Sequence, residues 1–183
     1  MLGWEARVLV IADINSGTYK FVLVMHILAA IVGFGGVFLN ALYGQQAKAR
    51  RGREGLAIAE ANFLVSNVAE FFIYGVLVFG ILLVLLSDDV WTFSQFWIWA
   101  SIVLYVIGLG LVHGVLRPNV RRMNALMAEL AEMGSPPMGD SPGGPPPQVT
   151  ELEERGQRVG LTGSVLNVLV VLILFLMIWK PGS

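Results

Sequence analysis

The sequence predicts an all-α integral membrane protein, a four-helix bundle of transmembrane helices with both termini outside. The 183 residues are 56% hydrophobic and only 14% charged, which is too apolar for a soluble domain of this size. Four stretches reach the roughly 20 apolar residues that cross a hydrocarbon core. Basic residues gather in alternate connections between these stretches, as they do on the cytoplasmic side of membrane proteins.

The four apolar stretches predict the transmembrane spans. Each is expected to be a helix, because backbone polar groups in lipid must be satisfied within their own segment, and none of the stretches alternates like a barrel strand. No cysteine is present, which excludes disulfides, thiolate metal sites and cysteine nucleophiles. We expect a single transmembrane domain over residues 1–183, with spans at about 21–43, 63–86, 96–116 and 161–179.

Charge bias predicts the orientation of the chain. Most of the basic residues follow the first span or the third, and this bias places both connections in the cytoplasm. The connection at 87–97 is acidic and rich in aromatic residues, which suits the outer interface. Anionic lipid headgroups would bind the same basic residues. These residues are Lys48, Arg50, Arg51, Arg53, Arg117, Arg121, Arg122, Arg155 and Arg158.

The segments outside the spans predict further local structure. Residues 1–11 are too short to span and carry charges, so they are expected to lie at the interface. Apolar residues at helical spacing after Arg117-Pro118 predict a short amphipathic helix. Residues 134–149 form a Pro/Gly-rich cytoplasmic linker, expected to be flexible. Thr150 and Glu153 then form a capping-box pattern that predicts a helix start.

Polar side chains within the spans carry the chemical information. Glu70 stands first, because an ionisable group in lipid is costly and marks a functional site by default. Counting 1.5 Å per residue places Glu70 about 10 Å from the inner end of its span, and similar depths follow for one polar residue on each other span. The candidate ligand or proton site consists of Glu70, His113, Asn40, Asn67, Asn167 and Tyr74.

Two interpretations of this polar group stay open. In the first, it is a hydrogen-bonded cluster in which a protonated Glu70 sets the packing of the helices, since interhelical polar contacts are common in membranes. In the second, it is a proton or small-solute site open to the cytoplasm, with Glu70 titrating and His113 near it.

His26 is a separate candidate. It lies about 8 Å below the outer face, and about 17 Å in depth from His113, so one haem cannot use both histidines as axial ligands. Met177 is a possible axial partner at the level of His26. Ligation of haem b by His26 and Met177 is one hypothesis, and a hydrogen-bonded packing histidine is the other.

Small residues predict close helix packing in three of the spans. Glycine, alanine and serine let helices approach closely in lipid. The residues are Ala29, Ala30, Gly33 and Gly36 in the first span, Gly110 and Gly114 in the third, and Gly160 and Ser164 at the start of the fourth.

Residues 20–36, with His26 near their start, resemble the first span of a bacterial family of predicted integral membrane proteins, domain of unknown function 2269. The aromatic and Lys-Pro ending at 175–181 is similar to that of the family, as is the acidic-aromatic pair Glu70-Phe71. The resemblance implies the bacterial cytoplasmic (inner) membrane. First spans of copper-resistance D type and HemJ-like proteins are distantly similar. HemJ-like proteins pair the histidine with a lysine in a later span, and no span here contains lysine.

Three functional hypotheses follow. The favoured one is a non-catalytic accessory or scaffold subunit, whose partners are the lipid bilayer and other membrane subunits or a second copy. The alternatives are a haem-binding redox or haem-handling protein using His26, and a proton or small-solute carrier using Glu70. No hydrolase triad, metalloprotease motif or phosphate loop is present, and nothing predicts nucleic-acid binding.

Overall fold

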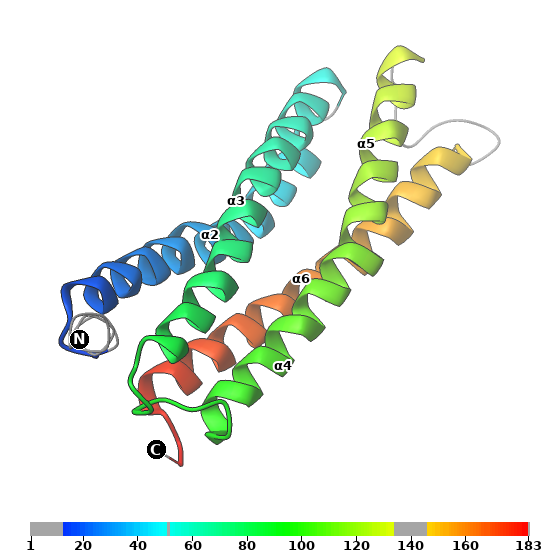
Figure 1. Cartoon of the computed structure of the whole chain (residues 1–183). Coiled ribbons are helices and arrows are strands. Elements are labelled where there is room, and N and C mark those ends of the chain that lie inside the picture. The colour runs from blue at the N-terminus through cyan, green and yellow to red at the C-terminus, as the bar shows by residue number, and fades with distance from the viewer. Residues whose placement is uncertain (1–12, 51, 134–145, 183) are drawn as a thin grey trace, which may run out of the picture. The chain divides into compact units, whose positions relative to one another are not determined.

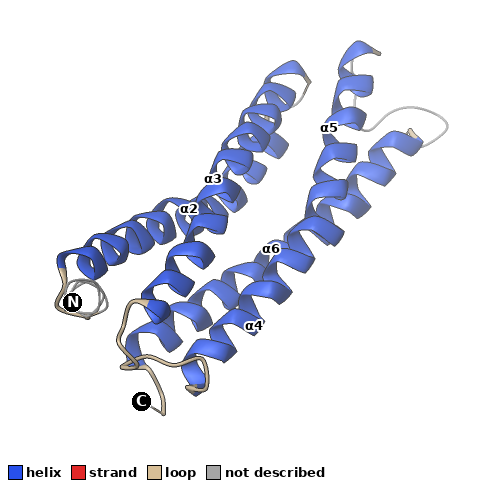
Figure 2. Ribbon diagram, in the orientation of Figure 1, coloured by secondary structure: helices blue, strands red, loops and turns tan. Residues whose placement is uncertain are grey.

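The computed structural model describes residues 13–50, 52–133 and 146–182. Regular structure in these residues is helical throughout (Figures 1 and 2). Four helical stretches are long and apolar enough to cross a membrane, which confirms the predicted all-α bundle of four transmembrane helices. The elements are α2 (Gly17–Ala49), α3 (Arg53–Leu85), α4 (Phe96–Leu111), the π-helix η1 (Val112–Leu116), α5 (Arg117–Glu132) and α6 (Pro147–Trp179).

The helices are longer than the bilayer requires. Helices α2, α3 and α6 each contain 33 residues, about 50 Å at 1.5 Å per residue, against a hydrocarbon core of about 30 Å. The start of α3, residues 53–62, is rich in Ala and Glu, which are strong helix formers in water. The helices therefore continue beyond the apolar stretches at the ends where the flanking sequence favours helix.

The third transmembrane helix passes a proline without ending. Pro118 has no N–H, so it cannot donate to the carbonyl four residues earlier. The preceding turn is wound as the π-helix η1, in which the Arg117 N–H bonds the Val112 carbonyl, and the Asn119 side chain donates to the Val115 carbonyl at 2.7 Å. The predicted amphipathic helix after Arg117-Pro118 is α5, and it continues α4 and η1 directly.

The start of α6 corrects a sequence-based prediction. The helix begins at Pro147 and not at Thr150, and the N–H of Val149 already bonds the Pro146 carbonyl at 2.9 Å. Proline is favoured at the first helical position, where its fixed φ fits and its missing N–H has no role. The last residues of the predicted linker 134–149 are thus helical, while 134–145 and the interfacial segment 1–11 lie outside the described residues.

The chain divides into two compact units, and each contains part of every transmembrane helix. Unit 1 consists of Met1–Gly36, Val68–Tyr105 and Val170–Ser183, and unit 2 of Val37–Asn67 and Val106–Leu169. A single domain over residues 1–183 stays a prediction.

Unit 1 is held together by very close contact between α2 and α3. A Cβ added at Gly36 would lie 2.6 Å from the Ala69 Cβ, and one at Gly33 would lie 2.9 Å from Ile73 Cγ1. Ala29 is 3% exposed in the same contact. The small residues predicted to pack in the first span do so here, and we call this contact the α2–α3 seam. It consists of His26, Ala29, Gly33 and Gly36 of α2 with Ala69, Ile73, Val76 and Gly80 of α3.

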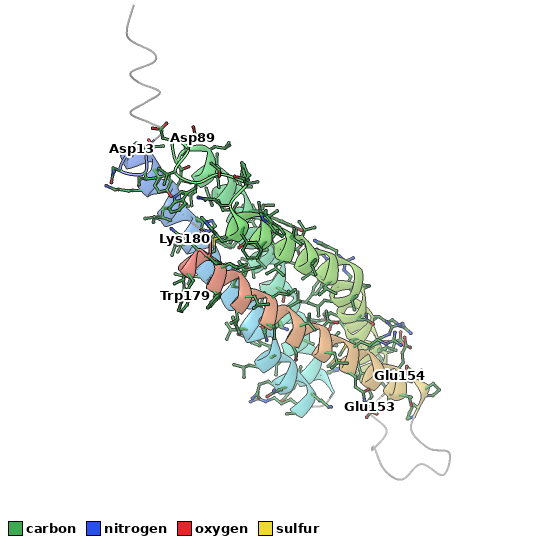
Figure 3. All side chains as sticks on the ribbon, turned by 90° about the horizontal axis from the view of Figure 1, so that it is seen from below. Asp13, Asp89, Glu153, Glu154, Trp179 and Lys180 are labelled. Carbon is green, nitrogen blue, oxygen red and sulfur yellow. The ribbon has the colours of Figure 1, made fainter. Side chains whose placement is uncertain are left out.

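Aromatic residues join three segments at one end of unit 1. Trp91 donates its indole N–H to the Tyr19 hydroxyl at 3.1 Å. The Lys180 ammonium lies 4.0 Å from the centre of the Trp91 ring and 5.6 Å from that of Trp97, close enough for cation–π attraction. Lys180 directly follows Trp179 at the end of α6 (Figure 3). The contact links the start of α2, the connection after α3 and the end of α6.

Charged residues join α5 to α6 in unit 2. Glu151 accepts hydrogen bonds from Arg122 at 3.2 Å and from Arg155 at 2.9 Å. These bonds, from Arg122 first, hold the pKa of Glu151 below its ordinary value. Arg155 also donates to the buried Asn119 at 2.9 Å. The sequence predicted both helices but not this network between them.

Candidate functional site

Glu70 and Tyr74 form a hydrogen-bonded pair on one face of α3. The Tyr74 hydroxyl donates to Glu70 Oε1 at 2.6 Å. The helical spacing of four residues brings the two side chains together. This pair belongs to unit 1.

Tyr74 also lines an apolar groove between α2 and α3. The groove has a volume of about 350 Å³. Two small residues of its lining lie close together, since a Cβ at Gly75 would lie 3.6 Å from the Ala29 Cβ. The walls contain four aromatic side chains and no charged residue. The lining residues are Met25, Leu28, Ala29, Phe71, Phe72, Tyr74, Gly75, Val78 and Phe79.

In unit 2 two of the predicted asparagines have hydrogen-bond partners on neighbouring helices. Ser66 of α3 donates to Asn40 Oδ1 of α2 at 2.9 Å. Arg117 donates to Asn67 Oδ1 at 3.3 Å, and so joins α5 to α3. Ser66 and Arg117 were not among the predicted site residues. Ser66 directly precedes the predicted Asn67, and Arg117 directly follows the predicted end of the third span.

Asn167 and His113 are the other predicted site residues in unit 2. The amide oxygen of Asn167 is buried and accepts no hydrogen bond within the described residues, and the same holds for Asn62 Oδ1. His113 lies in the π-helix η1 and is exposed. Asn40, Asn67, His113 and Asn167 all belong to unit 2, whereas Glu70 and Tyr74 belong to unit 1. The single six-residue site stays a prediction.

His26 lies in the α2–α3 seam. Its Nδ1 is 3.0 Å from the Val76 carbonyl oxygen, and because a carbonyl only accepts, Nδ1 carries the proton. Gly80 leaves room for the ring, since a Cβ there would lie 3.2 Å from His26 Cε1. The bond leaves Nε2 with a lone pair that can accept a hydrogen bond or bind a metal. His26 thus has the geometry of the predicted packing histidine.

Metal and haem ligation can be assessed from the donor groups. No group of three or more His, Cys, Asp or Glu residues able to hold a metal occurs among the residues described. Met177 lies in the last turn of α6, in the same unit as His26. Haem binding by His26 and Met177 stays a prediction.

Tyr105 is a further polar residue that the sequence did not single out. It is 7% exposed, and its hydroxyl donates to the Ile73 carbonyl at 3.0 Å, so it joins α4 to α3 in unit 1. A tyrosine in a transmembrane helix, away from the interfaces where tyrosines are enriched, was the signal that could have identified it.

The chain belongs to the family described as predicted integral membrane protein, domain of unknown function 2269, whose model matches residues 20–181. This finding confirms the resemblance seen in the sequence and identifies an integral membrane protein. No curated protein and no solved structure matches the chain.

Proposed function

We propose that this protein is a non-catalytic accessory or scaffold subunit that binds other transmembrane helices through glycine-bearing faces of its third and fourth transmembrane helices. One observation carries the proposal. No described atom lies within 4 Å of a Cβ position built at Gly110, Gly114 or Gly160. All three were among the small residues expected to make close helix contacts, and within the described chain no atom covers their Cβ positions.

The physical argument concerns what glycine does in a transmembrane helix. Glycine lowers helix stability by about 1 kcal/mol relative to alanine in water, and its advantage in lipid is the close approach of a second helix. Gly33 and Gly36 of the α2–α3 seam have that advantage inside the chain. Gly110 and Gly114, at GxxxG spacing, would have it in contact with a helix from another chain, either another subunit or a second copy.

The membrane and the orientation are part of the proposal. The family resemblance implies the bacterial cytoplasmic membrane, and the arginines near the start of α3 and along α5 favour the cytoplasm for that side. Both termini are then outside. Cysteine labelling of single-cysteine variants in intact cells tests this orientation, because the natural chain contains no cysteine.

The subunit role is tested by the size of the complex. Membranes from the native host are solubilised in mild detergent, and the mass of the particle is compared with the 19.9 kDa single chain. We expect a larger particle for the natural chain and the single chain for the double variant Gly110→Leu/Gly114→Leu.

The matched control is Gly35→Leu, the same change at an uncovered glycine of α2, which should leave the complex intact. A natural chain that is monomeric at its native level, or a double variant that keeps the full complex, contradicts the proposal.

Haem handling is a second candidate, and one observation favours it. His26 donates Nδ1–H to a backbone carbonyl, which is the arrangement that commonly orients a metal-binding histidine. A Soret band that is present in the natural chain, expressed with adequate haem, and absent in His26→Phe would support this candidate.

A further inference from the structure

We propose that the turn between α2 and α3 in unit 2 binds the headgroups of anionic phospholipids through Lys48, Arg50 and Arg53. The surface made by these three residues is called the basic turn. The proposal goes beyond the subunit role, because it uses none of the glycines assigned to the binding of other helices. It rests on three features: the exposed charge of the basic turn, the close backbone contacts that hold it, and its distance from the edge of the membrane.

The structure divides the basic residues near this side of the membrane into two groups. In one group the charge is used within the chain, since Arg122 and Arg155 bond Glu151. Arg121 likewise lies 5.8 Å from the centre of the Phe63 ring. The residues of the basic turn are all exposed, and within the described residues their side chains form no hydrogen bond and no ion pair. Their charge is therefore available to a partner outside the chain.

Close backbone contacts hold the basic turn together. Gly52 has a φ of 68°, a conformation that glycine adopts without strain, and its carbonyl accepts a hydrogen bond from the Leu56 N–H at 3.1 Å. A Cβ at Gly55 would collide with the Arg50 carbonyl oxygen and lie 2.6 Å from that of Ala47, so the two helix ends meet where glycine has no side chain. The backbone positions of the basic residues are thus fixed before a ligand binds, which lowers the ordering cost of binding.

The basic turn lies within electrostatic reach of the phospholipid headgroups. Lys48 is five residues past the predicted end of the first span, and Arg53 is ten residues before the predicted start of the second. At 1.5 Å per residue these positions are about 8 Å and about 15 Å from the hydrocarbon core. The headgroup layer is itself about 5–8 Å deep on each side, so both residues lie within about one Debye length, about 8 Å, of that layer. An anionic membrane surface attracts basic residues at such distances.

Apolar residues beside the basic turn favour a phospholipid over a soluble partner. Leu42 and Tyr43 of α2 precede the turn, and their exposed fractions are 58% and 38%. An exposed leucine offers acyl chains an apolar surface, and tyrosine is enriched where hydrocarbon meets headgroups. A phospholipid uses the charges and the apolar surface together, whereas a nucleic acid or an acidic soluble protein would use the charges alone.

The test compares anionic phosphatidylglycerol with zwitterionic phosphatidylcholine at the basic turn. The natural chain contains no cysteine, so a fluorophore is attached at Gly44→Cys, an exposed position four residues before Lys48 and on the same helix face. The labelled full chain is placed in phosphatidylcholine vesicles, in which a small fraction of one of the two lipids carries a nitroxide on its acyl chain. A nitroxide quenches the fluorophore on contact, so the ratio of the two quenching efficiencies measures the preference for the anionic lipid.

We expect the label at Gly44 to show a preference for phosphatidylglycerol of at least about fivefold, the factor that one basic residue supplies at an anionic surface. Added salt should reduce this preference, because the charges are exposed.

Two triple variants separate charge from structure. Lys48→Gln/Arg50→Gln/Arg53→Gln removes the charge and keeps similar helix propensity, so it should abolish the preference. Lys48→Arg/Arg50→Lys/Arg53→Lys keeps every charge and should keep the preference. Circular dichroism should show the helix content of the natural chain in both variants.

A second labelling position, Val90→Cys, is the matched control. Val90 lies in the connection after α3 and is 43% exposed, directly after the exposed residues Asp88 and Asp89. Phosphatidylglycerol should not be preferred there, because like charges repel.

The proposal is overturned if the label at Gly44 shows no preference, if the charge-removing variant keeps the preference or the charge-keeping variant loses it, or if the label at Val90 shows the same preference. An absent preference at Gly44 would leave the charges for a soluble acidic partner. Because Gly110 and Gly114 are unchanged in these variants, the mass of the complex stays a separate test of the subunit role.

Discussion

Two pairs of glycines have similar spacing, Gly33 and Gly36 in α2 and Gly110 and Gly114 in the third transmembrane helix. Among the described residues, only the first pair is covered by another helix. Gly33 and Gly36 lie against α3 so closely that a Cβ at either position would be 3.0 Å or less from a side-chain atom. Gly110 and Gly114 have no described atom within 4 Å of the same position. The comparison shows that a small-residue pattern predicts the capacity for close contact but does not identify the partner.

A second difference concerns how polar groups are satisfied. In the α2–α3 seam of unit 1, His26 bonds a backbone carbonyl of the neighbouring helix, which is possible because the helices are so close. In unit 2, the interhelical bonds join side chains, as in the pairs of Asn40 with Ser66 and Asn67 with Arg117. Close packing in the seam therefore makes backbone groups available as partners.

The largest effect is expected from Gly36→Val. The new Cβ would fall 2.6 Å from the Ala69 Cβ, so the α2–α3 seam must open, at a cost of about 1–3 kcal/mol or more. The control is Gly35→Val, where the adjacent glycine has no atom within 4 Å, and a change within about 0.5 kcal/mol is expected. Reversible unfolding in detergent measures both. Equal destabilisation of the two variants contradicts the close contact assigned to Gly36.

Gly80→Leu should have an intermediate effect. Its Cβ would lie 3.2 Å from His26 Cε1, and the rest of the leucine displaces the imidazole from the Val76 carbonyl. Loss of one interhelical hydrogen bond in a membrane costs about 1–2 kcal/mol at most. Nitrogen NMR of the histidine ring checks the cause, since Nδ1 should carry the proton in the natural chain and lose this preference in the variant. Gly44→Leu, at an uncovered glycine, is the control.

The smallest effect is expected at the exposed junction of α5 and α6. Arg122 and Arg155 lower the pKa of Glu151 below its ordinary value of 4.5. A lowered folded-state pKa means that the stabilisation is present above the unfolded-state value and is lost as pH falls through the folded-state value. The protection factors of the amides at the start of α6, which are corrected for the intrinsic pH dependence of hydrogen exchange, should therefore fall on acidification below pH 4.5.

Glu151→Gln should lower the same protection factors already at neutral pH, and added salt should reduce the difference because the pair is exposed. Glu153→Gln, at an exposed acidic residue two positions along, is the control. Protection factors that are independent of pH and unchanged in Glu151→Gln would show that the network does not hold α5 to α6.

The candidate site was predictable only where neighbouring residues share one helix. The pairing of Glu70 with Tyr74 follows from a spacing of four residues, which any helix converts into contact. The partners of Asn40 and Asn67 are more distant in sequence, at Ser66 and Arg117, and depend on the register between helices. The groove is a property of two helices together, since it is lined by Ala29 of one and Gly75 of the other.

Sequence by itself determined the class of this protein and the number of its transmembrane helices, because the length of an apolar stretch is a local property that lipid converts directly into a helix. It misplaced the start of α6, where Pro147 and Thr150 are competing local signals. Only the tertiary structure decided which glycines are covered, which nitrogen of His26 carries the proton, and that an apolar groove lies between α2 and α3. These depend on the distance and register between helices, to which residues far apart in the chain contribute jointly.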